Sequence, residues 1–591
     1  MAEEYERWDP NEETRGQVAA LRASEATAEL QAILGSRLEF GTAGLRGPMG
    51  PGYNRMNELV VLQTSQGLIR YVESLDPAAK SKGVIIGYDH RCLGSLSSES
   101  FARISAAVFL SQGFKVYLLQ GFVPTPFVAF GVRHLHTAVG IMVTASHNPK
   151  ADNGFKVYWN TGSQIVPPHD AGIAAHIDLN LAPWHAYDFS LEALESSPLY
   201  QRGITPLIAD AYFEAIGGLG NSKVNGASPV RAVYTAMHGV GCQWVQRAFE
   251  VYGHPTLDPV PLQSQPDPQF PTVRFPNPEE KGALDEAVRY ADLKGATLIL
   301  ANDPDADRLA VAERTPDATS ASAWYTFSGN ELGVLLGHWQ IQQWKRENTG
   351  TAALLASIVS SRMLKAICLA EGMEYHDTLT GFKWLGDKAI SLRAQGTPVL
   401  FMYEEALGYC IGNALCDKDG ISAASVFLEM AGVLAPQTVR QHLQSLYTQY
   451  GEYVSYNSYV LSHDKAVTAA IFQRLRTGGP DGTGTGGYWE NCAGCKVVAI
   501  KDITKGYDST TADLLSPLPV TPDSEMIMLE FDNLCSVTLR TSGTEPKIKF
   551  YTEIAGRPGQ ARAEAAALLH AFVDRLVDEM LQPDKNGLQR A

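Results

Sequence analysis

The sequence predicts an α/β protein with several domains. Short apolar runs alternate with amphipathic helical stretches over most of the chain, as strands and helices do in α/β folds. A chain of 591 residues is too long for a single hydrophobic core and suggests about four domains. With 45% hydrophobic and 19% charged residues, the composition is that of an ordinary globular protein.

The clearest strand and helix candidates begin at residue 83. Residues 83–89 (GVIIGYD) should form a strand, residues 97–114 a helix, and residues 115–119 the next strand. Further apolar runs lead into polar loops in residues 137–146, 231–241, 296–308 and 397–409. Ligands gather at the carboxyl ends of strands in open α/β sheets, so these loops are the candidate functional sites.

The last part of the chain has a different pattern. Residues 526–554 alternate apolar and polar side chains, as antiparallel strands with one wet face do, and residues 560–581 should form a covering helix. The glycine-rich run at 476–489 formally contains G-x-G-x-x-G, but a helical stretch precedes it rather than a strand, so we expect a loop. Cys492 and Cys495 form a lone C-x-x-C, which favours free thiols over zinc.

Charge and composition exclude several classes of partner. The net charge of -16 argues against a broad nucleic-acid surface, although small anions need only local positive sites. Eight cysteines in so long a chain do not indicate a disulfide framework. The start, MAEEYERWDPNEE, is acidic, unlike a secretory leader, and no apolar run approaches the ~20 residues that span a bilayer. We expect a cytoplasmic protein without nucleic-acid or membrane partners.

A serine and a histidine follow one of the predicted strands. The stretch VTASHNPKADNGFKVYW (143–159) places Ser146 and His147 directly after the apolar run, where we expect the serine to be exposed. Such a serine is either a turn cap or a nucleophile, and this stretch alone leaves both open.

Three carboxylates follow another strand. NDPDADR places Asp303, Asp305 and Asp307 at alternate positions, where they repel one another unless a cation such as Mg²⁺ or Ca²⁺ is bound. An EF-hand is excluded, because Arg308 and Arg314 occupy the loop positions that need glycine and glutamate. Arg308 is well placed to bind phosphate oxygens. The alternative is a solvated acidic turn.

A phosphate cradle is predicted between two strands of the last part. LRTSGTEPKIKFY (539–551) offers Arg540, two hydroxyls, Gly543 and Lys547. The glycine permits a tight turn with inward N–H groups, and the arginine adds a bidentate donor. A plain hairpin turn is the alternative.

Paired glutamates end a further strand. In YEEALGY, Glu404 and Glu405 suit vicinal sugar hydroxyls, whereas glycosidase chemistry needs carboxylates that face each other across a bond. A solvated strand edge is the alternative. Lys383 and Lys418 lie in nearby segments and could be surface lysines. Arg46, in the glycine-rich stretch 40–52 before a helix, marks either a flexible turn or an anion site.

Four of these motifs resemble one family. TASHNP, DPDADR, EEALGY and RTSGTEP occur in the order and spacing of the α-D-phosphohexomutase superfamily, from about Phe40 to Tyr551. GTAGLRG, TASHNPKADNGFKVYW and TGFKWLG resemble most the phosphoglucomutase-2 type enzymes, which also act as phosphopentomutases. The resemblance implies three related α/β domains and a C-terminal α+β domain around a central cleft. We place these domains at residues 1–205, 206–322, 323–452 and 453–591.

The resemblance also implies roles for individual residues. Ser146 would be the phosphoserine, and Asp303, Asp305 and Asp307 would bind Mg²⁺, which also touches Ser146. Other residues match positions that hold the sugar or its non-reacting phosphate: Glu404, Glu405, Ala406, Arg540, Ser542, Gly543 and Thr544. A last group matches substrate-contacting or proton-handling positions: Arg46, His147, Lys156, Arg308, Thr380, Gly381, Lys383 and Lys418. Of these, His147 and Lys418 are our candidates for proton transfer, and Lys156 joins them as a candidate catalytic residue.

The implied activity is that of an intramolecular phosphotransferase, an isomerase. It would convert ribose or deoxyribose 1-phosphate to the 5-phosphate and glucose 1-phosphate to the 6-phosphate. A sugar bisphosphate would be both intermediate and activator, turning over in the cleft while the Arg540 loop holds its distal phosphate. We expect a monomer acting on small phosphosugars.

One departure and two alternatives remain. Many relatives have serine where this chain has Ala406, which suggests a pocket less committed to hexose. The nearest alternative is a glucose 1,6-bisphosphate synthase with 1,3-bisphosphoglycerate as donor. A catalytically silent paralogue that only binds phosphosugars or a partner is disfavoured, because Ser146, the three aspartates and Arg540 are all present.

Overall fold

The computed structural model describes residues 1–590 except 42–43, 316–322, 479–486, 523, 543–545 and 558–559. The chain forms two compact units, one of residues 1–356 with 381–440 and one of residues 357–380 with 441–591. No helix in the described ranges is long and apolar enough to cross a bilayer.

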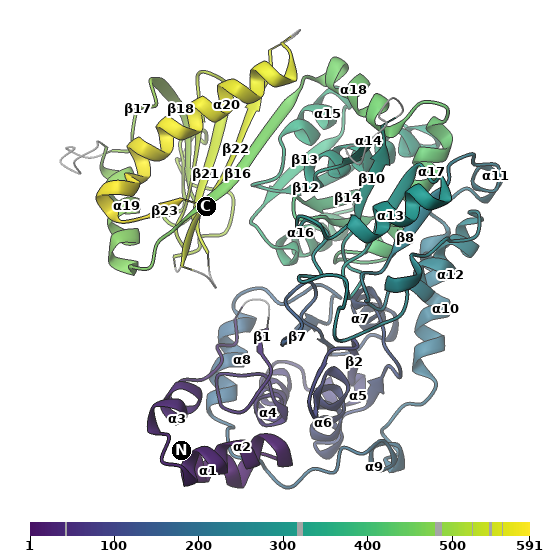
Figure 1. The fold of residues 1–591 in the computed structure, drawn as a ribbon, viewed down its shortest axis with the longest axis vertical. Helices are drawn as coiled ribbons and strands as arrows, with labels where there is room; N and C mark the ends of the chain where they lie inside the picture. Colours follow the sequence, from purple (N-terminus) through teal and green to yellow (C-terminus); the bar gives the residue numbers. More distant parts are fainter. Residues whose placement is uncertain are drawn as a thin grey trace. The chain divides into compact units, whose positions relative to one another are not determined.

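The first sheet of the first unit has five strands in the order β1-β7-β6-β2-β5. Figure 1 labels three of them, β1, β7 and β2. They are β1 (Leu45–Pro48), β2 (Val84–Tyr88), β5 (Val116–Leu118), β6 (Val139–Val143) and β7 (Asp152–Trp159). Strand β2 is parallel to β5 and β6, and β7 is antiparallel to β6. The strands predicted at 83–89, 115–119 and 137–146 are therefore confirmed.

Helices bury this sheet. They are α4 (Glu58–Leu75), α6 (Ser98–Ser111), α7 (Thr125–Leu135), α8 (His169–Asp178) and α10 (Ile204–Gly217). Helix α6, predicted at 97–114, starts where the Ser97 side chain accepts a hydrogen bond from the Ser100 N–H at 3.0 Å. Helix α4 packs on α6 and α8, and α7 packs on α10. Apolar strands need such cover on both faces.

The second sheet has the order β11-β10-β9-β8. Its strands are β8 (Ala232–Thr235), β9 (Leu298–Ala301), β10 (Ala310–Arg314) and β11 (Trp324–Thr326), with helices α12 (Cys242–Tyr252) and α13 (Asp285–Lys294) beside them. Strands β9 and β10 are antiparallel neighbours. The three aspartates therefore lie in the turn of a hairpin.

The third α/β region contains β12 (Ala353–Ser357), β14 (Val399–Glu404) and β15 (Gly408–Ile411), with helices α14 (Gly329–Glu347), α16 (Phe382–Ala394) and α17 (Gly420–Leu434). Strands β12 and β14 are parallel, and β14 and β15 form an antiparallel hairpin. The paired glutamates lie at the turn of this hairpin. Asp419 caps α17 by accepting hydrogen bonds from the backbone N–H groups of Ile421 and Ser422.

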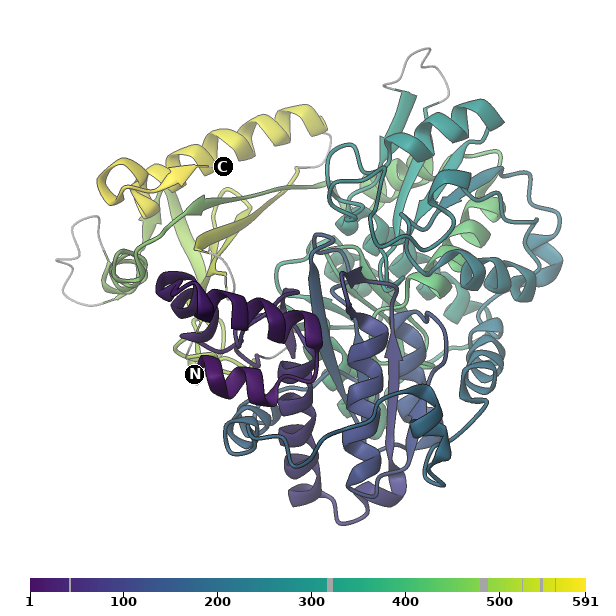
Figure 2. The same ribbon diagram turned by 60° about the horizontal axis from the view of Figure 1, so that its bottom comes forward.

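The chain begins with three short helices, α1 (Ala2–Trp8), α2 (Glu12–Ala23) and α3 (Thr27–Leu34). Figure 2 shows them as one dark purple group. Their small core contains Tyr5, Val18, Leu34, Tyr53 and Leu59. Because Leu59 belongs to α4, this core attaches the helices to the first α/β domain.

The second unit is rich in strands. Its main sheet includes β16 (Tyr453–Leu461), β18 (Cys495–Asp502), β20 (Met526–Phe531), β21 (Cys535–Thr541) and β22 (Lys547–Ala555), in the antiparallel order β18-β20-β21-β22-β16. Its helices are α15 (Met363–Glu371), α18 (Val439–Tyr450), α19 (Lys465–Thr477) and α20 (Arg562–Leu576), and β13 (Glu374–Thr378) lies beside α15. Helix α20, yellow in Figure 1, packs on β16 and β22. The antiparallel strands and covering helix expected from residue 526 onward are confirmed.

A helix, α19, precedes the glycine-rich run 476–489, as predicted, and most of that run lies outside the described residues. Cys492 and Cys495 are free thiols. The shorter elements are α5 (Ala79–Lys82), β3 (Cys92–Leu93), β4 (Leu96–Ser97), α9 (Leu191–Ser196), α11 (Ser222–Asn225), η1 (Pro261–Gln263), β17 (Asn491–Cys492), β19 (Tyr507–Asp508), η3 (Val577–Leu581), α21 (Pro583–Asn586) and β23 (Gln589–Arg590).

Candidate active site

Ser146 lies in the loop between β6 and β7 in an unusual backbone conformation. Its φ of 51° is in the left-handed region, which non-glycine residues adopt at a cost of about 1–2 kcal/mol. The Ser146 N–H donates to the Thr144 hydroxyl at 2.9 Å. The expectation of an exposed serine was wrong: Ser146 is only 2% exposed, because another loop packs onto its hydroxyl.

That loop carries the aspartates. The Ser146 Oγ donates to Asp303 Oδ2 at 2.7 Å and lies 3.3 Å from His147 Nδ1. The pKa of His147 is well below its usual value, because burial and the nearby cations Arg308 and Arg46 disfavour the imidazolium. A neutral imidazole therefore lies beside the serine hydroxyl.

The three aspartates are buried together. Asp303, Asp305 and Asp307 are at most 1% exposed, so a solvated acidic turn is excluded. Each offers a carboxylate oxygen within 4.8 Å of the others, and within the described ranges no other three His, Cys, Asp or Glu side chains do so. Asp305 Oδ1 and Asp307 Oδ1 are buried without a hydrogen-bond partner. Unpaired buried carboxylate oxygens suit a metal ion.

Two lysines balance part of this charge. Lys156 Nζ, on β7, lies 2.7 Å from Asp305 Oδ2 and 3.0 Å from Asp307 Oδ2, and Lys418 Nζ lies 3.5 Å from Asp307 Oδ2. Burial lowers the pKa of each lysine, but the carboxylates raise it more, so both pKa values lie above normal. Both lysines are held as cations next to the aspartate cluster.

The pKa values of Asp303 and Asp305 shift in opposite directions. Burial and the two neighbouring carboxylates raise the pKa of Asp303 well above its usual value. Burial also opposes ionisation of Asp305, but the Lys156 ammonium and the Thr125 hydroxyl lower its pKa more. Thr125, at the start of α7, donates to Asp305 Oδ2 at 2.6 Å. Helix α7 therefore anchors the aspartate loop (residues 303–307), a contact that no sequence motif indicated.

Arg308 joins the aspartate loop to the turn that carries Glu404 and Glu405. Its backbone N–H donates to Asp303 Oδ1 at 3.0 Å, and its guanidinium donates to the Ala406 carbonyl at 3.0 Å. A Cβ at Gly408 would lie 2.4 Å from Lys418 Cδ and 3.0 Å from Glu404 Cγ, so a side chain at this position would displace both. Arg308, Glu404, Ala406 and Lys418 thus come together as the motifs predicted, and Glu405 occupies the same turn.

Arg46 and Lys383 are also in the first unit. Arg46 lies on β1, paired with β7, rather than in a flexible turn, and its guanidinium donates to Asn148 Oδ1 at 3.1 Å. Gly381, with a φ of 102°, precedes α16 and lets the chain turn into that helix. Lys383 follows in the first turn, and burial lowers its pKa to about 8.

The predicted phosphate cradle lies in the second unit. Arg540, on β21, donates a hydrogen bond to the Thr380 hydroxyl, so two predicted substrate-binding residues meet there. The backbone N–H of Ser542 donates to the Lys547 carbonyl at 3.0 Å. Gly543 and Thr544 lie outside the described residues.

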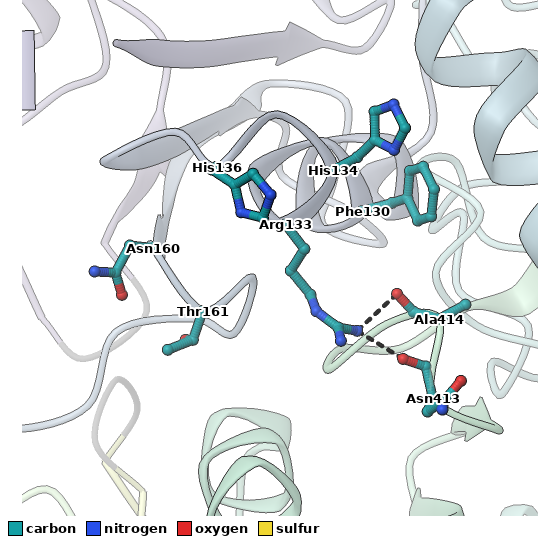
Figure 3. Close-up of a pocket in the computed structure, with 8 residues that line it drawn as sticks. All are labelled: Phe130, Arg133, His134, His136, Asn160, Thr161, Asn413 and Ala414. Carbon is teal, nitrogen blue, oxygen red and sulfur yellow. Dashed lines mark hydrogen bonds between the residues drawn. The ribbon is translucent and has the colours of Figure 1, made fainter. Parts of the chain in front are cut away.

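A polar hollow of about 400 Å³ lies elsewhere in the first unit (Figure 3). Arg133 of α7 reaches into it and donates to the carbonyls of Asn413 and Ala414 at 2.7 and 2.8 Å. Thr125, which anchors the aspartate loop, lies eight residues earlier on α7, about 12 Å along the helix. This hollow is therefore distinct from the aspartate cluster.

Comparison with known proteins identifies the family. Three models, phosphoglucomutase/phosphomannomutase alpha/beta/alpha domains I, II and III, match residues 37–182, 210–316 and 328–450. The chain belongs to this family. It is 44% identical to human phosphopentomutase, covering 99% of this chain and 96% of that protein. Identity to human glucose 1,6-bisphosphate synthase is 41%, covering 98% and 94%.

The fold agrees with this assignment. The crystal structure of the phosphoglucomutase parafusin from Paramecium, in an open form, matches with a TM-score of 0.67 at 17% identity, covering 93% of this chain and 96% of that one. The predicted superfamily, the phosphopentomutase type, the isomerase class and the architecture of three α/β domains with a β-rich C-terminal domain are confirmed.

Proposed function

We propose that this protein moves a phosphoryl group between positions of a sugar phosphate through Ser146. Its main reaction would convert ribose or deoxyribose 1-phosphate to the 5-phosphate, with glucose 1-phosphate to 6-phosphate as a further activity. The observation that carries the proposal is the Ser146 hydroxyl, which lies 2.7 Å from an aspartate of a buried three-carboxylate cluster. The 44% identity to a phosphopentomutase supports the choice of a pentose.

We propose Mg²⁺ as the metal, held by Asp303, Asp305 and Asp307 with Ser146, because these ligands are all oxygens. When bound, it would neutralise charge on the phosphoryl group during transfer.

In the first half-reaction, a sugar hydroxyl attacks the phosphorus of phosphorylated Ser146. The bond from phosphorus to the serine oxygen breaks, and a sugar bisphosphate forms. His147, whose Nδ1 lies 3.3 Å from the serine oxygen, is the proposed group that takes the proton from the attacking hydroxyl and passes it to the leaving serine oxygen. Lys418 and Lys156 are held as cations, so they are suited to donating protons and neutralising charge rather than to accepting protons.

In the second half-reaction, the bisphosphate has reversed and its other phosphate faces Ser146. The serine oxygen attacks that phosphorus, and the isomerised monophosphate leaves. Glu404, Glu405 and the Ala406 turn would hold the sugar hydroxyls, with Arg46, Arg308, Gly381 and Lys383 as further substrate contacts. Arg540, Thr380, Ser542, Gly543 and Thr544 would bind the non-reacting phosphate. A sugar bisphosphate would also phosphorylate resting Ser146 and so act as activator.

A coupled assay with Mg²⁺ tests the proposal. Ribose 1-phosphate, glucose 1-phosphate, and glucose 1-phosphate with 1,3-bisphosphoglycerate are compared, for the wild type, Ser146→Ala and Ser105→Ala. Ser105 is a matched control, since it is a fully buried serine whose hydroxyl donates to the Phe101 carbonyl within α6.

We expect isomerisation of both monophosphates, faster for the pentose, that is lost only in Ser146→Ala. Accumulation of bisphosphate with little isomerisation would indicate the synthase. Full activity of Ser146→Ala would require another nucleophile, and inactivity of the wild type towards all substrates would indicate a silent paralogue.

A further inference from the structure

The loop that carries Ser146 closes around one buried arginine. Arg91, just after β2, is 1% exposed. Its NH2 group donates to the carbonyls of Ser146 at 2.6 Å and Asn148 at 2.8 Å, and its NH1 group donates to the carbonyls of Pro149 at 2.8 Å and Asp152 at 3.1 Å. One planar guanidinium therefore binds four carbonyls of the segment 146–152, which begins with the serine itself.

These contacts hold a strained backbone. Ser146 adopts a φ of 51°, and the peptide on each side of its Cα is fixed by a hydrogen bond. The Thr144 hydroxyl accepts a hydrogen bond from the N–H of Ser146, and Arg91 donates a hydrogen bond to the carbonyl of Ser146. Sparsely populated backbone conformations persist only where surrounding contacts determine them, and they concentrate at functional sites.

Arg91 is itself fixed from its other side. Its Nε lies 3.4 Å from Asp89 Oδ2, and its backbone N–H donates to Asp89 Oδ1 at 3.0 Å. Ser98 donates to the same Asp89 oxygen at 2.5 Å and accepts from Asn153 Nδ2 at 2.9 Å. The guanidinium also lies 5.3 Å from the centre of the Phe270 ring. These contacts leave the Arg91 guanidinium little freedom to rotate, so the directions of its four hydrogen bonds to the loop are fixed.

We propose that Arg91 is a positioning residue for phosphoryl transfer, because it sets the direction in which Ser146 presents its oxygen towards the aspartate loop. This proposal rests on the proposed mutase function. Arg91 acts through the loop backbone and does not touch the substrate, so its loss should slow transfer and leave substrate binding intact.

The test compares Arg91→Lys, Arg91→Met and Asp89→Asn/Arg91→Met with the wild type. The double variant avoids leaving the buried Asp89 carboxylate without its cation. Arg474→Lys is the matched control, because Arg474 also donates to a backbone carbonyl, that of Met580, but lies in the second unit. The measurements are kcat and KM for ribose 1-phosphate, and the rate at which glucose 1,6-bisphosphate phosphorylates Ser146, followed by mass spectrometry. Mg²⁺ affinity and Tm report on folding.

We expect kcat and the phosphorylation rate to fall about 100-fold with methionine and about 10-fold with lysine, because small misplacement of a reacting atom is costly. KM and Mg²⁺ affinity should stay within about 3-fold of the wild type, and Arg474→Lys should match the wild type. Lysine keeps the charge but cannot reproduce the planar four-way contact.

Two results would overturn the proposal. One is a folded Arg91→Met or double variant that phosphorylates Ser146 at the wild-type rate. The other is loss of Mg²⁺ affinity in proportion to loss of kcat, which would show general damage to the site. If methionine prevents folding, Arg91→Lys decides by the same criteria. A wild type without isomerase activity would instead contradict the proposed function.

Discussion

The two regions predicted to handle phosphate differ in how their charges are partnered. Around Ser146, the buried aspartates form ion pairs with the side chains of Lys156, Lys418 and Arg308, which hold these side chains in place. Arg540, in the second unit, is half-buried, donates to a neutral hydroxyl and lies 6.0 Å from the Tyr551 ring centre. A neutral partner is easily exchanged for phosphate. The region around Ser146 therefore suits a fixed phosphoryl donor, and the region around Arg540 suits binding and release of a phosphate.

Removing one proposed metal ligand should have the largest effect. We expect Asp305→Asn to lower kcat about 1,000-fold, because the developing charge on the phosphoryl group loses its neutralisation. Lys156 keeps Asp307 as a partner 3.0 Å away, so the variant should fold. The checks are the coupled assay and titration calorimetry with Mg²⁺ alone.

Asp210→Asn is the control, since Asp210 is an exposed aspartate paired with Arg247 at 2.5 Å. It should behave as the wild type. Unchanged kcat and Mg²⁺ affinity in Asp305→Asn would remove Asp305 from the proposed metal site.

Arg540→Met should act mainly on binding. A hydrogen bond to a charged group contributes about 1.5–3 kcal/mol, so we expect kcat/KM to fall about 100-fold, mostly through KM. Phosphorylation of Ser146 at saturating bisphosphate should change little. Arg562→Met, which removes an exposed arginine paired with Glu452 in the same unit, is the control. An unaltered KM in Arg540→Met would show that this region does not bind the phosphate.

Much of the fold could be predicted, because strand and helix periodicity is local. The strands that lead to Ser146 and to the aspartates were expected from apolar runs that end in polar residues, and β6 and β9 confirm them. Strand β1 was missed, because its glycine-rich sequence has no apolar alternation and becomes a strand only by pairing with β7. Tertiary pairing decided that element.

The candidate site could be predicted where charged residues cluster in the sequence, as Asp303, Asp305 and Asp307 do. The burial of Ser146 could not, because it depends on a contact with Asp303 from another domain. Arg91 and Thr125 were also missed. Both follow apolar stretches, but the contacts that tie them to the site are with the carbonyls of the Ser146 loop and with the distant Asp305 carboxylate, which leave no local sequence signal.

Lys383 differs from Lys156 and Lys418 in its pKa, and this difference predicts a pH dependence of substrate binding. Lys156 and Lys418 are held charged by carboxylates, whereas burial lowers the pKa of Lys383 to about 8. Lys383 is cationic below that pH and neutral above it, so its attraction for a phosphosugar weakens as the pH rises. We expect the wild-type KM to rise by up to about 10-fold between pH 7 and 9. Lys383→Arg should flatten this rise, because arginine stays charged.

Lys388→Arg, on the same helix α16, controls for the substitution and should keep the wild-type profile. A KM that is flat with pH in the wild type, or a rise that persists in Lys383→Arg, would argue that Lys383 does not contact the substrate.

Ala406→Ser should have the smallest effect and tests whether the turn that carries Glu404 and Glu405 selects between hexose and pentose. The Ala406 carbonyl is held by Arg308 at 3.0 Å, so the backbone should stay in place while a hydroxyl is added. A new hydrogen bond to hexose would contribute about 0.5–1.5 kcal/mol. We therefore expect the ratio of kcat/KM for glucose 1-phosphate to that for ribose 1-phosphate to rise about 2- to 10-fold. An equal fall for both sugars would indicate disturbance of the loop, and an unchanged ratio would mean that residue 406 does not determine the preference between hexose and pentose.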